Sequence, residues 1–207
     1  MEFLKAFISL LVLINPVGAI PLFISLTHAQ SKIEKKRTIR VAAIAVALVI
    51  ITSAFIGEFV IKLFGISMAS FRTGGGILLL LLAISMLNAQ LAPARQTPEE
   101  TDEAEHKHSI GVVPLAIPLL TGPGAISTVI IYTDRIRHWW EYSYMIGAGV
   151  VIGLITFAAL NLADPISRLV GRTGINISTR LMGLLLSAVG IEFICAGLVE
   201  LLPGLAK

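Results

Sequence analysis

Helix-breaking and polar residues interrupt the first apolar segment of the chain. Residues 15–21 read NPVGAIP, which brings one asparagine, two prolines and one glycine into an otherwise apolar stretch. Proline removes a backbone N–H donor, and glycine permits backbone angles that helices do not use. In lipid, such a break persists only where protein or a polar cavity covers the freed backbone groups. Freed amides at a helix start attract a carboxylate, and freed carbonyls attract a cation or an ammonium group, so this stretch predicts a binding site for a small zwitterion.

A second break of the same kind lies in the fourth apolar segment, where residues 121–127 read TGPGAIS and Pro114 and Pro118 precede them. We expect Gly18 and Gly124 to lie in unwound stretches whose backbones face one shared polar cavity, with Asn15, Thr121 and Ser127 adding side-chain hydrogen-bonding groups. Proline kinks that only shape the packing are the alternative. The predicted substrate-binding residues are Asn15, Pro16, Gly18, Pro21, Thr121, Gly122, Pro123, Gly124 and Ser127.

Five ionisable residues in or beside the apolar segments are predicted to serve coupling or gating, because charge at bilayer depth is costly and usually faces the protein interior. Glu192 lies near the middle of the sixth segment. A lone carboxyl in a dry environment retains a proton readily, which suits proton coupling; a packing role is the alternative. We expect Glu58 to pair with Arg72 and Asp164 with Arg180, as gates or hinge locks. The alternative for these four is snorkelling to lipid headgroups.

Composition indicates that membrane-spanning helices position these residues. The chain has 207 residues, of which 56% are hydrophobic and only 14% are charged, whereas about a quarter of a soluble domain is charged. Segments of about 20 residues, at about 1.5 Å per residue, span the roughly 30 Å hydrocarbon core. The predicted spans are 3–27, 41–62, 73–92, 110–132, 143–163 and 181–202. Gly149 and Gly153 form a GxxxG pattern that favours close helix packing.

The two halves of the chain resemble each other. NPVGAIP matches TGPGAIS at an offset of 106 residues, and Arg72 matches Arg180 at an offset of 108. Matches at nearly one offset indicate a duplication, and three spans per copy make the second copy inverted. The predicted fold is an all-α integral membrane protein of six transmembrane helices in two inverted three-helix repeats, with helices 1 and 4 broken near the midplane. The repeats cover 1–92 and 110–207, and a charged linker covers 93–109.

Four motifs carry a resemblance to a known family. INPVGAIPLF, FRTGGGIL, VVPLAIPLLTGPGAIS and TRLMGLLL, in this order, resemble the MarC family of bacterial and archaeal inner-membrane proteins. The resemblance covers essentially the whole chain. It implies a six-helix protein of the plasma membrane. It also implies a relation to amino-acid exporters, since some members are described as transporters of small neutral amino acids.

The distribution of basic residues predicts the orientation. The loops after the first, third and fifth segments hold ten of the 16 Lys and Arg residues, and loop 28–40 contributes five of these ten. Cytoplasmic loops carry an excess of such residues. We therefore expect loop 28–40 in the cytoplasm and both termini outside it, in a multi-pass protein of the inner membrane.

The function that these features favour is secondary transport of a small neutral amino acid or a similar zwitterion, coupled to Na⁺ or H⁺, by alternating access of the two repeats. The alternatives are a membrane scaffold or regulatory protein and a membrane-embedded enzyme. We expect no enzymatic activity, because the spans contain no histidine and no paired carboxylates at mid-depth. We also expect no cofactor, no metal site at His106 and His108, and no nucleic-acid partner, so the partners are the lipid bilayer and a small-molecule substrate. The sequence leaves the oligomeric state open.

Overall fold

The described part of the chain is all-helical. The computed structural model describes residues 2–28, 30–88, 120–202 and 204, and these residues contain helices and no strand. The linker 93–109 and the first part of the fourth segment, with Pro114 and Pro118, lie outside the described residues. The elements are α1 (Glu2–Ile14), α2 (Ile20–Leu26), α3 (Lys32–Leu63), α4 (Met68–Leu87), α6 (Pro123–Thr133), the 3₁₀ turn η2 (Trp139–Glu141), α7 (Tyr142–Asn161) and α8 (Ala163–Leu201).

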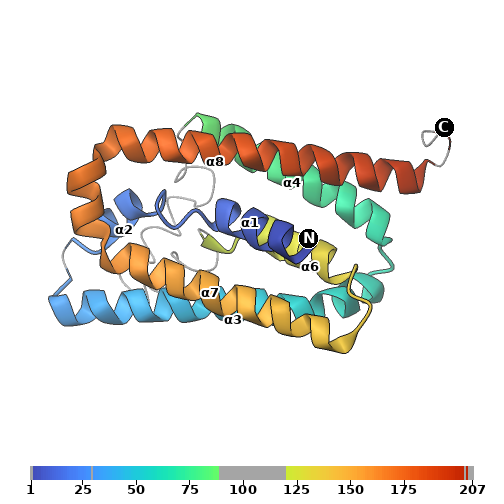
Figure 1. The fold of residues 1–207 in the computed structure, drawn as a ribbon, viewed down its shortest axis with the longest axis horizontal. Coiled ribbons are helices and arrows are strands. Elements are labelled where there is room, and N and C mark those ends of the chain that lie inside the picture. The colour runs from blue at the N-terminus through green and yellow to red at the C-terminus, as the bar shows by residue number, and fades with distance from the viewer. Residues whose placement is uncertain (1, 29, 89–119, 203, 205–207) are drawn as a thin grey trace.

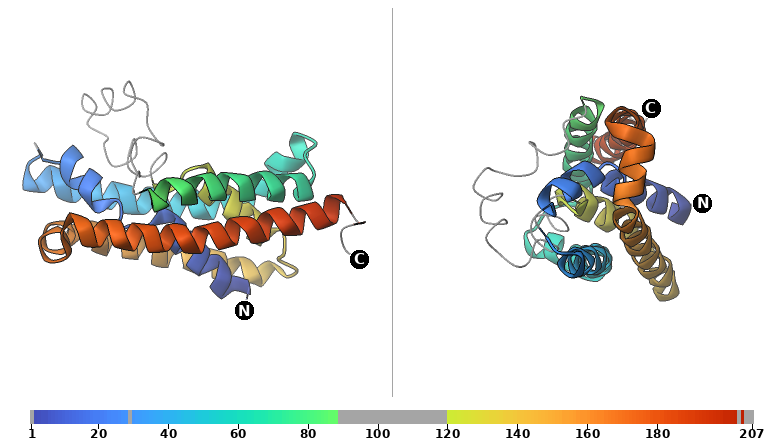
Figure 2. Two further views of the ribbon diagram at one scale, coloured as in Figure 1. Left: turned by 90° about the horizontal axis from the view of Figure 1, so that it is seen from above. Right: turned by 90° about the vertical axis from the view of Figure 1, so that its left-hand side faces the viewer.

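The helices form three layers. Figure 1 shows α4 beside α8 on one side of the molecule, α3 beside α7 on the other, and α1, α2 and α6 between them. The end-on view in Figure 2 agrees with this order. By length and composition, α3, α4, α7 with η2, and α8 are able to cross a membrane, whereas α1 and α6 are shorter apolar helices. The short helices that flank the predicted breaks therefore occupy the middle of the bundle.

A seam of small residues holds α4 against α8. Its members recur every seventh residue on both helices, namely Ala69, Gly76 and Ala83 on α4 and Gly183, Gly190 and Gly197 on α8. A Cβ atom added to Gly76 would lie 2.6 Å from the carbonyl oxygen of Gly190, and one added to Gly183 would lie 2.9 Å from that of Ala83. The contacts run antiparallel. Since a seven-residue spacing keeps one face of a helix toward its partner, the two backbones stay close along their length.

The GxxxG pattern on α7 packs as predicted. A Cβ atom on Gly153 would lie 3.0 Å from the carbonyl oxygen of Ala43, and one on Gly149 would lie 3.4 Å from that of Ala47, both on α3. These contacts also run antiparallel. Close packing of small residues thus builds both outer pairs, α4/α8 and α3/α7, on either side of the central helices.

Two helices begin well before the apolar spans that the sequence predicts. α3 begins at Lys32 rather than 41, because Ser31 and Glu34 form a reciprocal capping box. α8 begins at Ala163 and turns a corner at Gly171, whose φ of 66° and ψ of 173° are non-helical. The helix then continues past the expected start at 181. Apolar length marks the part of a helix that suits lipid, whereas the helix itself extends into water wherever caps satisfy its end.

Candidate functional site

The first predicted break lies between α1 and α2. The helix stops at Ile14, residues 15–19 form turns, and Asn15 has a left-handed φ of 43°. The Oδ1 atom of Asn15 accepts a hydrogen bond from the backbone N–H of Gly18 at 3.1 Å. Its Nδ2 atom donates to Thr179 Oγ1 on α8 at 3.4 Å. Asparagine tolerates this backbone region because its short side chain bonds locally, so Asn15 both ends the helix and ties the break to α8.

The two prolines of the break change its backbone hydrogen bonding in different ways. Pro16 has no N–H, so the carbonyl of Val12 loses the amide that would serve it in a continuous helix. Pro21 has the same effect on the carbonyl of Val17, but the N–H of Ile20 bonds to that carbonyl at 3.1 Å. Pro16 and Gly18 are buried. The end of α1 therefore presents carbonyl groups to the middle of the bundle.

The second break precedes α6, which begins at Pro123 after the extended residue Gly122 (φ −65°, ψ −179°). Proline suits the first helical position because its missing N–H would have no partner there. Ser127 and Thr128 turn their hydroxyls back to the carbonyl of Gly124, at 3.0 Å and 2.7 Å. Thr121 and Gly122 are buried and Pro123 is exposed. The N-terminal half of this predicted broken helix lies outside the described residues.

The two breaks meet at one level of the bundle because α1 and α6 pack antiparallel. Ser9 Oγ lies 3.3 Å from the hydroxyl of Tyr132, toward the far end of α6. At the other end of this contact, a Cβ atom on Gly124 would lie 3.6 Å from Leu13 Cδ1. The carbonyl end of α1 is therefore close to the amide end of α6. A negative and a positive helix end side by side complement an ammonium and a carboxylate group on one ligand.

The expectation that Gly124 lies in an unwound stretch is wrong, because Gly124 is the second residue of α6. The space that a side chain at this position would enter is apolar and not a polar cavity. A Cβ atom there would lie 2.7 Å from Leu82 Cδ1 and 3.2 Å from Leu79 Cδ2. Leucine side chains of α4 thus fill this space, in addition to Leu13 of α1. The physical reason is that α6 is wedged between α1 and α4, and a glycine lets α6 approach both helices.

Arg72 has different partners from the one predicted. Its guanidinium donates to Asp134 Oδ2 at 3.2 Å and to Glu200 Oε2 at 3.1 Å, and only 12% of its side chain is exposed. Glu58 pairs instead with Lys62, one turn later on α3. Burial raises the pKa of the Asp134 carboxyl, Arg72 lowers it, and the charges of Glu58 and Glu200 raise it further, for a net increase.

The pairing of Asp164 with Arg180 is also wrong. Asp164 accepts a hydrogen bond from Lys35 Nζ at 3.0 Å, which joins the start of α8 to the first turn of α3. The Nζ atom of Lys35 also lies 5.4 Å from the ring centre of Phe23 on α2. Arg180 is exposed and forms no ion pair with any residue that the structure describes. The corner at Gly171 separates Asp164 from the long part of α8 that carries Arg180, so the two side chains do not meet.

Glu192 is not an isolated carboxyl, because Lys5 lies near it. Its side chain is 58% exposed and lies 3.9 Å from Lys5 Nζ on α1. The residue after it, Phe193, points inward and packs edge-on against Tyr132. The helix rotation that buries Phe193 turns Glu192 outward, so its environment differs from the one the sequence suggests.

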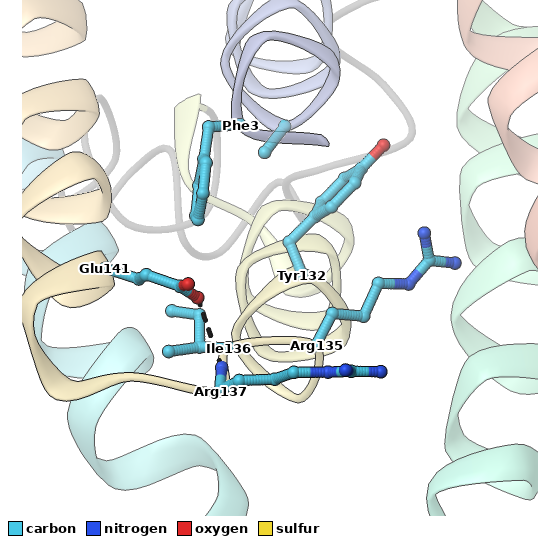
Figure 3. A pocket seen from close by; sticks show the side chains of 7 residues that line it. Phe3, Tyr132, Arg135, Ile136, Arg137 and Glu141 are labelled. Atoms are coloured by element: carbon cyan, nitrogen blue, oxygen red, sulfur yellow. Dashed lines mark hydrogen bonds between the residues drawn. The ribbon is translucent and has the colours of Figure 1, made fainter. Parts of the chain in front are cut away.

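A pocket of about 250 Å³ opens at the end of the bundle where α6 stops. Phe3 and Ala6 of α1, Tyr132 of α6, the loop residues Arg135, Ile136 and Arg137, and Glu141 line it. Figure 3 shows Phe3 and Tyr132 on opposite sides of the space below α1, Glu141 on the α7 side, and the side chains of Arg135 and Arg137 both extending away from Glu141. Glu141 accepts a hydrogen bond from the backbone N–H of Arg137 at 3.1 Å, which holds the loop. Aromatic, aliphatic and charged groups thus share one opening beside the contact of α1 with α6.

Sequence reasoning missed several residues that these contacts single out. They are Lys5, Lys35, Asp134, Thr179 and Glu200. Asp134 and Glu200 lie at the ends of apolar segments. Charged residues are common at such positions, so they do not by themselves indicate a functional role. The sequence feature that could have identified Asp134 is the loss of apolar character at the end of the fourth segment. No sequence feature identifies Thr179, apart from its position next to Arg180. Within the described ranges, no three His, Cys, Asp or Glu side chains gather as metal ligands would.

The fold and this site define an all-α, multi-pass integral membrane protein with a broken helix at its centre. The chain belongs to the MarC family of integral membrane proteins, whose sequence model matches residues 1–202. The UPF0056 membrane protein YhcE of Escherichia coli is 44% identical over 206 residues, covering 98% of this chain and 94% of the relative.

More distant relatives match over a similar length. The UPF0056 membrane protein MJ0972 of Methanocaldococcus jannaschii is 37% identical, covering 96% of this chain and 87% of the relative. YvbG of Bacillus subtilis, also a UPF0056 membrane protein, is 36% identical, covering 97% of this chain and 96% of the relative. No solved structure matches the chain.

Proposed function

We propose that the protein is a secondary transporter of small neutral amino acids or similar small zwitterions, driven by Na⁺ or H⁺, in the inner membrane. It is a transporter rather than an enzyme or a scaffold, and it acts without a cofactor. The observation that carries this proposal is the meeting of the carbonyl end of α1 with the amide end of α6 at the centre of the bundle. A scaffold has no need of a broken helix there, because a continuous helix leaves fewer backbone groups to satisfy.

The geometry suits a ligand that carries both charges. Carbonyls of the last turn of α1, among them that of Val12, are available to an ammonium group. At the start of α6, Pro123 has no N–H and the amides of Ala125 and Ile126 bond to the carbonyl of Gly122, so the amide of Gly124 is the one that a carboxylate would meet there. A net-neutral ligand satisfies both ends without bringing an uncompensated charge into the membrane, whereas an anion or a cation alone satisfies only one. This preference is why we favour neutral amino acids.

Three antiparallel contacts support a six-helix inverted repeat. α1 pairs with α6, α3 with α7, and α4 with α8, and each pair joins the corresponding helices of the two halves. Gly65 and Gly171, 106 residues apart, each have a φ of 66° at the corner before the third helix of their half. A two-fold axis in the membrane plane produces this pairing, since it turns every helix antiparallel to its counterpart. The two breaks lie where such an axis crosses α1 and α6.

The ends of the bundle support the proposed orientation. The start of α3 and the corner of α8 lie at one end, and α4 and η2 begin at the other (Figure 1). The first end carries the basic residues of loop 28–40 with Arg168 and Arg172, which supports a cytoplasmic position for it. The pocket beside Arg135 then opens outside the cytoplasm. Tyr132 lines that pocket and contacts Ser9, so the pocket adjoins the path along α1 and α6 toward the breaks.

Reconstitution tests the proposal. The purified protein is placed in proteoliposomes with labelled alanine, glycine or serine, and uptake and efflux are measured with an imposed proton gradient, an imposed Na⁺ gradient, or neither. We expect accumulation of at least one of these amino acids, stimulated by one of the two gradients, and competition by unlabelled substrate but not by its amide. Protein-free liposomes serve as the control. If none of the neutral amino acids moves faster than in these liposomes, the proposed function is wrong.

A further inference from the structure

A three-residue ion network joins three helices at the end of the bundle that carries the pocket. We call it the Arg72 network; it consists of Arg72 at the start of α4, Asp134 at the end of α6 and Glu200 at the end of α8. The Arg72–Glu200 contact lies within the α4/α8 pair, whereas the Arg72–Asp134 contact reaches from that pair to the central helix α6. The contact with Asp134 therefore ties the end of α6 to the outer pair of helices.

Within the network, one guanidinium faces two carboxylates, so its three residues alone carry a net charge of −1 when both acids are ionised. The other charged groups that face Asp134 are Glu58 and Lys62 on α3, which neutralise each other, and Arg135. Arg135 is exposed, with its guanidinium 5.8 Å from the ring centre of Tyr132, and it has the smallest effect on Asp134. In a partly buried place, a net charge of one unit is costly, and a bound proton removes it.

Of the two carboxylates, Asp134 is the one that we expect to bind the proton. Its side chain is 30% exposed, whereas that of Glu200 is 55% exposed and reaches water more easily. Asp134 is also the C-cap of α6, where the negative end of the helix disfavours a further negative charge. The raised pKa of Asp134 agrees with this assignment. In addition, the Nε atom of Arg72 is buried and has no acceptor among the residues that the structure describes. Arg72 thus has a spare donor, with which it can bind Glu200 through two nitrogens once Asp134 is neutral.

We propose that the Arg72 network is a proton-binding lock, in which the end of α6 is held against α4 while Asp134 carries a proton and is released when that proton leaves to the surrounding water. The sign follows from linkage: a proton stabilises whichever state binds it more tightly. The held state partly shields Asp134 from water and binds the proton more tightly, whereas the released state hydrates the carboxylate and binds it at an ordinary pKa. As a gate for substrate the lock rests on the proposed function, but as a proton site it does not.

Spin-label distances test the lock without measuring transport. Cys195 is replaced by Ser, single cysteines are introduced at Ser70 on α4 and Arg137 after α6, which are both exposed, and the labelled protein is studied in lipid nanodiscs. Distances between the labels are recorded from about pH 5 to about pH 9, a range that lies above the ordinary carboxyl pKa of about 4, so that only a raised pKa produces a transition within it. We expect a longer distance to gain population as the pH rises. If the distribution is the same at all pH values, the proposal is wrong.

The label distance in the Asp134→Asn variant distinguishes this lock from a simple salt bridge. Asparagine imitates the protonated acid, so we expect the short distance at every pH; a simple salt bridge would instead break, and the long distance would dominate. Glu200→Gln leaves one carboxylate for one guanidinium, so it should also keep the short distance at every pH and gives the same test if the first variant does not fold. A long distance in either Asp134→Asn or Glu200→Gln would overturn the proposal.

The two proposals fail in different ways. A pH-dependent distance in a protein that moves no amino acid retains the proton lock and removes the transport function. Transport by a protein whose label distance ignores pH removes the lock and retains the transport function. If both hold, Asp134→Asn should reduce the exchange rate in proteoliposomes at least tenfold, because the end of α6 then stays held.

Discussion

Replacing Asn15 tests the break between α1 and α2 most directly. In Asn15→Ala, the buried N–H of Gly18 loses its acceptor, which costs about 1–3 kcal/mol. Alanine at the left-handed φ of 43° adds about 1 kcal/mol. The contact with Thr179 is long, at 3.4 Å, and adds little. The free energy of unfolding should therefore fall by about 2–4 kcal/mol.

Asn15→Gly separates the two contributions. Glycine accepts the backbone angle without strain but lacks the amide, so it should recover only about 1 kcal/mol relative to alanine, or about 2–4 °C in Tm for a chain of this size. Transport should be strongly reduced in both variants, because the amide that ties the break to α8 is absent in each. Thermal unfolding followed by tryptophan fluorescence in detergent, together with proteoliposome uptake, measures both effects.

A matched control is Asn176→Ala, since Asn176 is exposed on α8 and should change the unfolding free energy by less than about 0.5 kcal/mol. If the Asn15→Gly protein transports at the parental rate, the asparagine side chain only shapes a turn and its proposed role in transport is wrong. If the Asn15→Ala variant is more stable than the Asn15→Gly variant, the proposed effect of the left-handed backbone angle is wrong.

Three further predictions address topology, the exposed glutamate and the helix seam. A reporter that is active only outside the cytoplasm should be active when fused after Lys207 and silent when fused at Gln96; the opposite pattern would reverse the proposed orientation. Glu192→Gln should leave gradient-driven accumulation within about twofold of the parent, since this carboxylate is exposed and paired with Lys5; loss of accumulation in a folded protein would return Glu192 to a coupling role. Gly76→Val should prevent folding or cost more than about 3 kcal/mol, because its Cβ would lie 2.6 Å from a backbone oxygen, whereas Gly147→Val meets nothing within 4 Å and should be tolerated; size-exclusion profiles and Tm values would show equal damage if the seam were loose.

Much of this architecture can be predicted from the sequence, because it depends on the properties of short stretches of residues. Apolar length indicates which segments suit lipid, and the prolines and glycine of residues 15–21 break the helix wherever it is placed, as the turn at Asn15 confirms. The GxxxG pattern on α7 likewise predicts close packing that the contact with α3 confirms. These features depend on a residue and its near neighbours in the chain, so a sequence suffices to predict them.

Partners that are distant in the chain depend on tertiary structure instead. Arg72 could have paired with any acidic residue near the same end of the bundle, and the packing of α4 against α6 and α8 selects Asp134 and Glu200 rather than Glu58. Likewise, the rotation of α8 decides that Phe193 is buried and Glu192 exposed. Whether a charge is balanced, and whether a glycine faces a cavity or a leucine, follows from which helix faces meet. That choice is made by the sum of many weak packing contacts across the bundle, which no short stretch of sequence contains.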